Sequence, residues 1–307
     1  MTTRAVLSAL VAALVACACE SIPERSRPAA DRVRDEIAEV NGTKLAWKSY
    51  GSGERAIVFV QGAQLAREMW EDQARNLAEP KVFAERRRTV FYDVRGFGKS
   101  GPMTEPFSHE NDLRALLDAL EIERATLVGL SLGGRIAIEF AVEHPERVEA
   151  LVLVGPGLLG FPFKEEPEAW HDEIRAAIQA RDGARAVEAW LSSGYMLPAM
   201  QNPELASKLR KLALANTANW LQTDFEIPLD PAAIGRLSTI RCPTLVLVGS
   251  RDVPEMHAIA DHLDREIPNS RKAVIAASGH VPNLERPMEF ERLVREFLAE
   301  ARPLEKP

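Results

Sequence analysis

The stretch "ATLVGLSLGGRIAIEF", residues 125–140, contains the motif G-x-S-x-G at positions 129–133. An apolar run precedes the motif, and a run with apolar residues at helical spacing follows it. In this strand–turn–helix context, G-x-S-x-G forms a nucleophile elbow, a strained turn that exposes the serine Oγ above a sheet. Ser131 is therefore the candidate nucleophile. The alternative is a glycine-rich turn that serves only packing.

Short apolar runs alternate with helical patterns on both sides of this stretch. A hairpin with an Asn41-Gly42 turn is predicted over residues 37–51. Buried strands are predicted at residues 56–62, 88–96, 125–130, 149–156, 244–250 and 271–277, and helices at 66–79, 112–120, 135–144, 255–266 and 286–300. Such alternation predicts an α/β fold with right-handed crossovers and a mostly parallel sheet that is covered on both faces.

Residues 156–236 interrupt this alternation. The interval is helix-forming and rich in aromatic residues. A segment inserted beyond the carboxyl ends of parallel strands is well placed to cover a site. We therefore expect a helical cap at 156–236 and a core made of residues 37–155 and 237–301. The cap aromatics fit either a partly apolar substrate or a core between the cap helices.

A serine hydroxyl needs a general base at neutral pH, and six histidines compete for that role. His280 lies in "ASGHVPNLERP", a loop just past the last predicted strand, where sites of parallel sheets form. The other five lie at predicted helix ends or in polar and helical stretches: His109, His144, His171, His257 and His262. His280 is the candidate base.

The candidate carboxylate is Asp252 in "TLVLVGSRDVP", which also follows a predicted strand. It would fix the imidazole tautomer and stabilise the imidazolium. Asp93 occupies a similar loop after an earlier strand, where its structural alternative is to brace Arg95 or a backbone turn. The order Ser131, Asp252, His280 is the order in which α/β-hydrolases carry their triad.

Four segments, "DVRGFGKS", "GLSLGG", "CPTLVLVGSRD" and "GHVPNLERP", give the chain its resemblance to a known family. Over most of residues 40–300 it resembles the α/β-hydrolase fold family, in the branch with a cap between strands six and seven. The resemblance implies a mostly parallel eight-stranded sheet with helices on both faces. It also implies esterase or enol-lactonase chemistry, and a serine elbow differs from the aspartate of haloalkane dehalogenases and epoxide hydrolases.

One departure from the family concerns the loop after the third strand. The family usually has His-Gly there, and this chain has Gln61-Gly62-Ala63. By the resemblance, the backbone N–H groups of Ala63 and Leu132 form the oxyanion hole. Because these donors belong to the main chain, Gln61 does not remove the hole, and its amide can hold the loop.

The N-terminus carries Arg4 and then an apolar run over residues 5–18, shorter than the about 20 residues that span a membrane. It fits a secretory signal. "LVAC" at 14–17 resembles the bacterial lipobox, which implies a signal peptide at 1–16, lipidation of Cys17 and a solvated tether at 17–36. We expect an exported, membrane-anchored lipoprotein that faces the periplasm or the cell exterior. Ordinary cleavage, which gives a soluble secreted or periplasmic protein, is the alternative.

Composition excludes some function classes. The net charge is −7 with scattered basic residues, which disfavours a nucleic-acid partner. No CxxC or HExxH spacing occurs, so neither a metal nor a cofactor is expected. The first hypothesis is a serine hydrolase that cleaves a small ester, thioester or lactone through an acyl-enzyme. Carbon–carbon hydrolysis, haloperoxidase or perhydrolase chemistry with the same triad, and a non-catalytic binding protein remain alternatives; the oligomeric state stays open.

Overall fold

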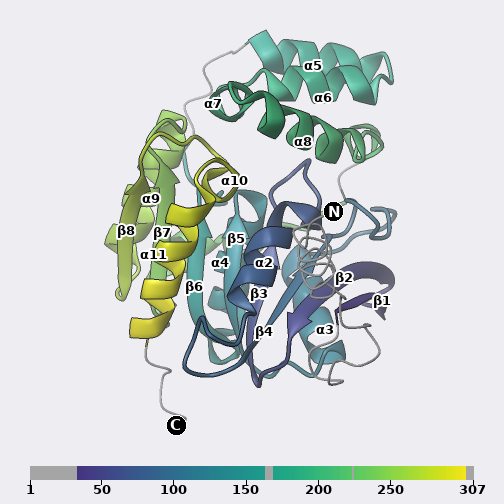
Figure 1. The fold of residues 1–307 in the computed structure, drawn as a ribbon. Coiled ribbons are helices and arrows are strands. Elements are labelled where there is room, and N and C mark those ends of the chain that lie inside the picture. Colours follow the sequence, from purple (N-terminus) through teal and green to yellow (C-terminus); the bar gives the residue numbers. More distant parts are fainter. Residues whose placement is uncertain (1–32, 163–168, 223–224, 302–307) are drawn as a thin grey trace, which may run out of the picture. The chain divides into compact units, whose positions relative to one another are not determined.

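The computed structural model describes residues 33–162, 169–222 and 225–301 (Figure 1). The predicted signal peptide and Cys17 lie outside these residues. Among the described residues, none forms a helix of the length and apolarity needed to cross a membrane.

Eight strands form one sheet in the order β1-β2-β4-β3-β5-β6-β7-β8. β1 pairs antiparallel with β2 and β2 antiparallel with β4, whereas all other neighbours are parallel. The strands are β1 (Arg34–Val40), β2 (Thr43–Gly51), β3 (Arg55–Val60), β4 (Arg87–Tyr92), β5 (Ala125–Leu130), β6 (Val148–Val154), β7 (Thr244–Gly249) and β8 (Ser270–Ile275). The predicted mostly parallel eight-stranded sheet is confirmed.

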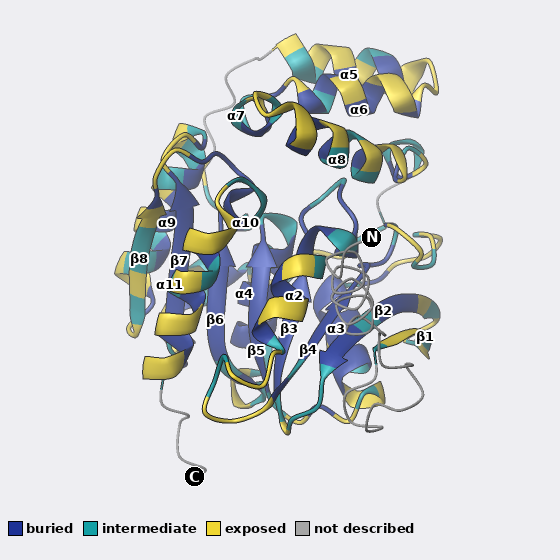
Figure 2. Cartoon of the chain, viewed as in Figure 1, coloured by how far each residue is buried: buried dark blue, intermediate teal, exposed yellow. Residues whose placement is uncertain are grey.

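Helices cover both faces of the sheet, as predicted. Side chains alternate along β3: Val58 joins one apolar cluster with α3 (His109–Ala119), α4 (Leu132–Glu143) and α9 (Pro254–Glu266). Phe59 joins a second cluster with α2 (Glu71–Leu77) and α11 (Pro287–Glu300). The central strands are therefore buried on both sides, whereas the outer faces of α2 and α11 are exposed (Figure 2).

In the described part of the chain, four α-helices lie between β6 and β7: α5 (Ala169–Gln179), α6 (Gly183–Leu191), α7 (Leu197–Met200) and α8 (Pro203–Leu214). We call these helices, with their connecting turns and residues 215–222, the cap. They lie beyond the carboxyl ends of the parallel strands (Figure 1). Two helices start with side-chain caps, since Asp182 accepts from Arg185 N and Asn202 accepts from Leu205 N.

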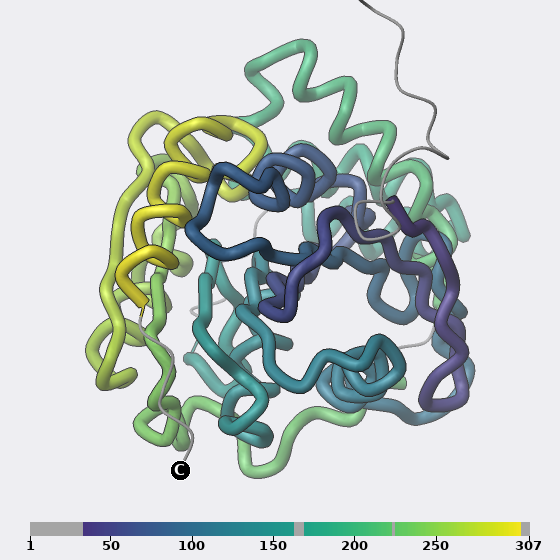
Figure 3. The backbone as a smooth tube through the Cα atoms, turned by 60° about the horizontal axis from the view of Figure 1, so that its bottom comes forward, coloured from purple at the N-terminus to yellow at the C-terminus, as the bar shows by residue number. Residues whose placement is uncertain are grey.

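The structure corrects several predicted boundaries. Residues 34–36, predicted as the end of the tether, belong to β1. This strand is at one edge of the sheet, opposite the edge with β8 and α11 (Figure 3), and its charged residues are exposed. The predicted helix over 66–79 is shorter and starts with a 3-10 turn, η3 (Arg67–Trp70). β3 ends at residue 60, which leaves Gln61-Gly62-Ala63 in a loop.

Candidate active site

Ser131 lies between the last residue of β5 and the first residue of α4. Its φ of 52° and ψ of −111° place it in a region that L residues rarely adopt. The turn needs glycine nearby, because a Cβ on Gly129 would lie 2.2 Å from the carbonyl oxygen of Gly133. The serine N–H donates to Val154 O at 3.0 Å, which ties the turn to the end of β6.

Asp252 and His280 form a buried pair. Asp252 follows β7 and His280 follows β8. His280 Nδ1 lies 2.9 Å from Asp252 Oδ2 and 3.2 Å from Oδ1, and Oδ1 also accepts from Val253 N. This contact holds the ring with Nδ1 toward the carboxylate. Nε2 is then the nitrogen that can exchange a proton with a nucleophile.

The contacts of Gly155 and of its neighbour Val154 place Ser131, Asp252 and His280 at the same end of the sheet. Gly155 directly follows Val154, the residue that accepts the Ser131 N–H. A Cβ on Gly155 would lie 3.1 Å from both Asp252 Oδ2 and His280 Nδ1. The serine turn and the Asp–His pair therefore meet at the carboxyl end of β6. Sequence reasoning missed Gly155, which adopts a positive φ of 44° in the structure.

The loop after β3 is closed by Gln61. This side chain is fully buried, and its Nε2 donates to Leu65 O at 2.5 Å. The amide thus holds the loop as a donor, as predicted, whereas its Oε1 accepts no hydrogen bond from the described residues. A Cβ on Gly133 would lie 2.2 Å from Val60 O and 2.7 Å from Gln61 O. The first turn of α4, which starts with Leu132, therefore lies against the segment that leads to Ala63.

Glu285 is a second residue that sequence reasoning missed. It ends α10 (Pro282–Glu285), and its carboxylate accepts from Gly279 N at 2.9 Å and Val281 N at 3.3 Å. These N–H groups flank His280, so the carboxylate fixes the backbone on both sides of the imidazole. Burial raises the pKa of Glu285 above its ordinary value. The glutamate lies in the "NLERP" run at 283–287, but the sequence does not indicate which N–H groups donate to it.

Asp93 has a structural role. It is fully buried and accepts from Arg67 N at 2.8 Å and Lys99 N at 3.0 Å, which joins two loops. Burial raises the pKa of its carboxyl to about 6. The expected brace to Arg95 is wrong: that guanidinium pairs with Asp112, with Nη2 2.8 Å from Oδ1. The alternative of bracing a backbone turn fits Asp93.

The cap reaches the histidine loop. The ring of Tyr195 meets the ring of His280 edge to face at 5.0 Å, and Trp170 lies 6.3 Å from Tyr195. A Cβ on Gly279 would lie 2.8 Å from Pro198 of α7. One cap aromatic, Tyr195, is thus in contact with the catalytic histidine candidate, and Trp170 packs against Tyr195.

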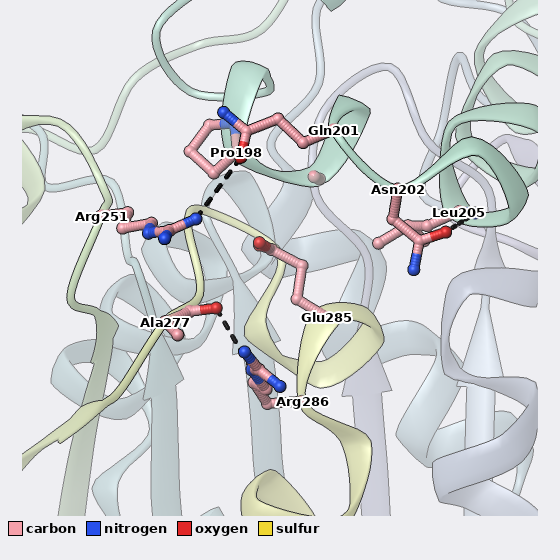
Figure 4. A pocket seen from close by; sticks show the side chains of 9 residues that line it. Pro198, Gln201, Asn202, Leu205, Arg251, Ala277, Glu285 and Arg286 are labelled. Atoms are coloured by element: carbon pink, nitrogen blue, oxygen red, sulfur yellow. Dashed lines mark hydrogen bonds between the residues drawn. The ribbon is translucent and has the colours of Figure 1, made fainter.

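A pocket of about 230 Å³ lies between the cap and the loops after β7 and β8 (Figure 4). Arg251 Nη1 donates to Gln201 Oε1 at 3.4 Å across it, and Glu285 also faces it. Its lining does not include the three candidate triad residues. In the described part of the chain, His, Cys, Asp and Glu form no group of three or more that could hold a metal ion.

Comparison with known proteins identifies the family of the chain. The model of a family described as alpha/beta hydrolase fold matches residues 55–287. A 2-hydroxy-6-oxo-6-phenylhexa-2,4-dienoate hydrolase of Comamonas testosteroni is 31% identical over 298 residues, covering 86% of this chain and 98% of its own.

Solved structures agree with the family match. The enol-lactonase from Burkholderia xenovorans LB400 has a TM-score of 0.68 and 25% identity, covering 86% of this chain and 100% of its own. A thermophilic esterase from Thermogutta terrifontis has a TM-score of 0.69 and 27% identity, covering 86% and 98%. These three relatives are named as a hydrolase, an enol-lactonase and an esterase. The chain therefore belongs to the alpha/beta hydrolase family and is a hydrolase of that fold.

Proposed function

We propose that the protein is a serine hydrolase that cleaves a small carboxylic ester, thioester or lactone through an acyl-enzyme. One observation carries the proposal: the buried hydrogen bond between Asp252 and His280 lies beside the strained turn of Ser131. A serine, a base and an orienting carboxylate in this relation form the constellation of nucleophilic acyl transfer.

In the proposed mechanism, Ser131 Oγ attacks the substrate carbonyl carbon while His280 Nε2 accepts its proton. The carbonyl oxygen becomes an oxyanion that accepts from the N–H groups of Ala63 and Leu132, each worth about 3 kcal/mol in the transition state. The tetrahedral intermediate then collapses, and the imidazolium gives its proton to the leaving oxygen or sulfur. His280 then deprotonates a water molecule, which attacks the acyl-enzyme. The second tetrahedral intermediate collapses and releases the acid, and the imidazolium returns the proton to Ser131 Oγ.

The cap favours a partly apolar acyl group. Tyr195 contacts His280 and Trp170 contacts Tyr195, so an aromatic surface lies next to the proposed reacting centre. The names of two solved relatives, an enol-lactonase and an esterase, support ester and lactone substrates.

Carbon–carbon hydrolysis is the second candidate. The relative from Comamonas testosteroni is named as a hydrolase of a 2-hydroxy-6-oxo dienoate, a substrate with a vinylogous diketone. The same serine, histidine and aspartate would serve that reaction, so the proposed triad does not separate the two.

A substrate panel separates them. Purified protein is assayed with p-nitrophenyl esters and lactones of graded acyl length and with a 2-hydroxy-6-oxo dienoate, and Ser131→Ala is the control. We expect the highest kcat/KM on an ester or lactone and loss of that activity in the variant. Turnover of the dienoate with none of the esters would replace the first proposal by the second. Ester turnover that persists in Ser131→Ala would reject both.

The proposed location is the membrane surface. The lipobox-like run that ends at Cys17 supports export and lipid attachment, with the hydrolase core on the periplasmic or outer side. A single acyl chain binds a membrane weakly, whereas several chains anchor firmly. Lipidated Cys17 should therefore keep the enzyme in the membrane fraction.

A further inference from the structure

Three amide side chains follow α8 at a spacing of three residues: Asn216, Asn219 and Gln222, in "NTANWLQ". The segment turns through η5 (Asn219–Leu221), so residues three apart share a face. All three amides cross from the cap to loops of the core. We call them the amide row.

Two members of the row hold the loop after β3. Asn219 Oδ1 accepts from Gln64 Nε2 at 3.2 Å, and Asn216 Nδ2 donates to Gln64 O at 3.4 Å. Gln64 is thus bound through both its side chain and its main chain. It directly follows Ala63, whose N–H is a proposed oxyanion donor.

The same two amides hold the loop after β4. Asn219 Nδ2 donates to Gly96 O at 3.1 Å, and Asn216 Oδ1 accepts from Gly98 N at 2.7 Å. Both asparagines are buried. A buried amide with partners on both its ends is costly to rotate, because rotation leaves donors and acceptors unpaired. The pair therefore has one favourable orientation.

Gln64 needs such support. Its φ of 62° lies in the left-handed region, which residues other than glycine seldom adopt. An unrestrained loop would relax from this conformation and rotate the peptide units next to it. The N–H of Ala63 lies one residue away, so its direction depends on Gln64 keeping its shape.

We propose that Asn216 and Asn219 are positioning residues, which aim the Ala63 N–H at the oxyanion by holding Gln64 and so couple the seating of the cap to transition-state stabilisation. This inference rests on the proposed acyl transfer. A displacement of residues 216–222 from the core would remove the partners of Gln64 and loosen the oxyanion hole.

The test compares Asn219→Ala with Gln222→Ala. Gln222 is the matched control, because it belongs to the same row but bonds to Met103 N, at 3.0 Å, and has no bond to Gln64. For Asn219→Ala we expect kcat on the best p-nitrophenyl ester to fall about tenfold, with KM within about twofold, since an oxyanion donor acts mainly in the transition state. Gln222→Ala should keep the wild-type kcat.

Two further readouts separate positioning from loss of structure. Affinity for a trifluoromethyl ketone, which forms an oxyanion on Ser131, should fall by the same factor as kcat. The pH profile of kcat/KM should not move, because the Asp252–His280 bond is untouched. Gln64→Ala supplies a second variant, on the core side of the contact. When both substitutions are combined, the fall in kcat should not exceed that of Asn219→Ala alone.

The possible results distinguish this inference from the proposed function. Wild-type kcat in both Asn219→Ala and Gln64→Ala would overturn the inference and leave the proposed function intact. Equal losses in Asn219→Ala and Gln222→Ala, with matching drops in melting temperature, would also overturn it, because the row would then only hold the cap. Absence of any acyl turnover in the wild type would refute the proposed function, and the inference with it.

Discussion

Replacing Gly133 with alanine should separate the two proposed oxyanion donors. A Cβ on Gly133 would lie 2.2 Å from Val60 O and 2.7 Å from Gln61 O, whereas ordinary contacts begin near 3.4 Å. Both oxygens belong to backbone, so no side chain can turn away. The first turn of α4 must therefore move from the end of β3 by about 1.2 Å, the gap between a 2.2 Å and a 3.4 Å contact.

This movement carries Leu132 away from Ala63. A donor displaced by about 1 Å no longer reaches the oxyanion within the 2.7–3.1 Å that stabilises it, and loss of one donor costs about 10²–10³ in kcat. We therefore expect Gly133→Ala to lose at least about 100-fold in kcat on a p-nitrophenyl ester, with KM changed by less than about threefold.

The control is Gly235→Ala, since Gly235 is exposed and its Cβ would meet no atom within 4 Å. It should retain wild-type kcat. Overpacking lowers the free energy of unfolding by about 1–3 kcal/mol. Circular dichroism and a melting curve are therefore measured to check that Gly133→Ala is folded at the assay temperature. A folded Gly133→Ala with kcat within about threefold of the wild type would refute the proposed hole.

Three other variants test separate parts of the account. Asp252→Asn should lower kcat by about 10⁴ through the wrong imidazole tautomer, and a loss smaller than about tenfold would contradict its role. Burial raises the pKa of Glu285 in the folded state, so folding favours the protonated side chain. The free energy of unfolding that this preference contributes is present below pH 4.5 and is lost as pH rises through the folded pKa. In urea unfolding, the stability of Glu285→Gln relative to the wild type should therefore increase as pH rises above 4.5, and a difference that does not change with pH would refute this. Cys17→Ala should move the protein from the membrane to the soluble fraction; an unchanged distribution would exclude lipid anchoring.

The sheet and the placement of the candidate triad could be predicted from sequence because each signal is local. Ser131 lies in a motif between a strand and a helix, and Asp252 and His280 each follow an apolar strand. Parallel strands bring their carboxyl ends to one edge, so residues in those loops must gather. Membership of a hydrolase family also favours an enzyme over a non-catalytic binding protein.

Contacts between distant segments could not be predicted in this way. Asn219 and Gln64 are 155 residues apart, and neither lies in a recognisable motif. Gly155 likewise lies close to Asp252 and His280, which follow it much later in the chain. β1 was missed at its start because an edge strand keeps charged residues on its exposed sides, which resembles a solvated tether.

Covalent labelling tests whether Ser131 is a nucleophile that His280 activates. Purified protein is treated with a fluorophosphonate, and peptide mass spectrometry locates the adduct. We expect one adduct, on Ser131, that is lost in Ser131→Ala and forms at least about 100-fold more slowly in His280→Ala, the scale of general-base catalysis. Labelling that persists in Ser131→Ala, or an unchanged rate in His280→Ala, would contradict it.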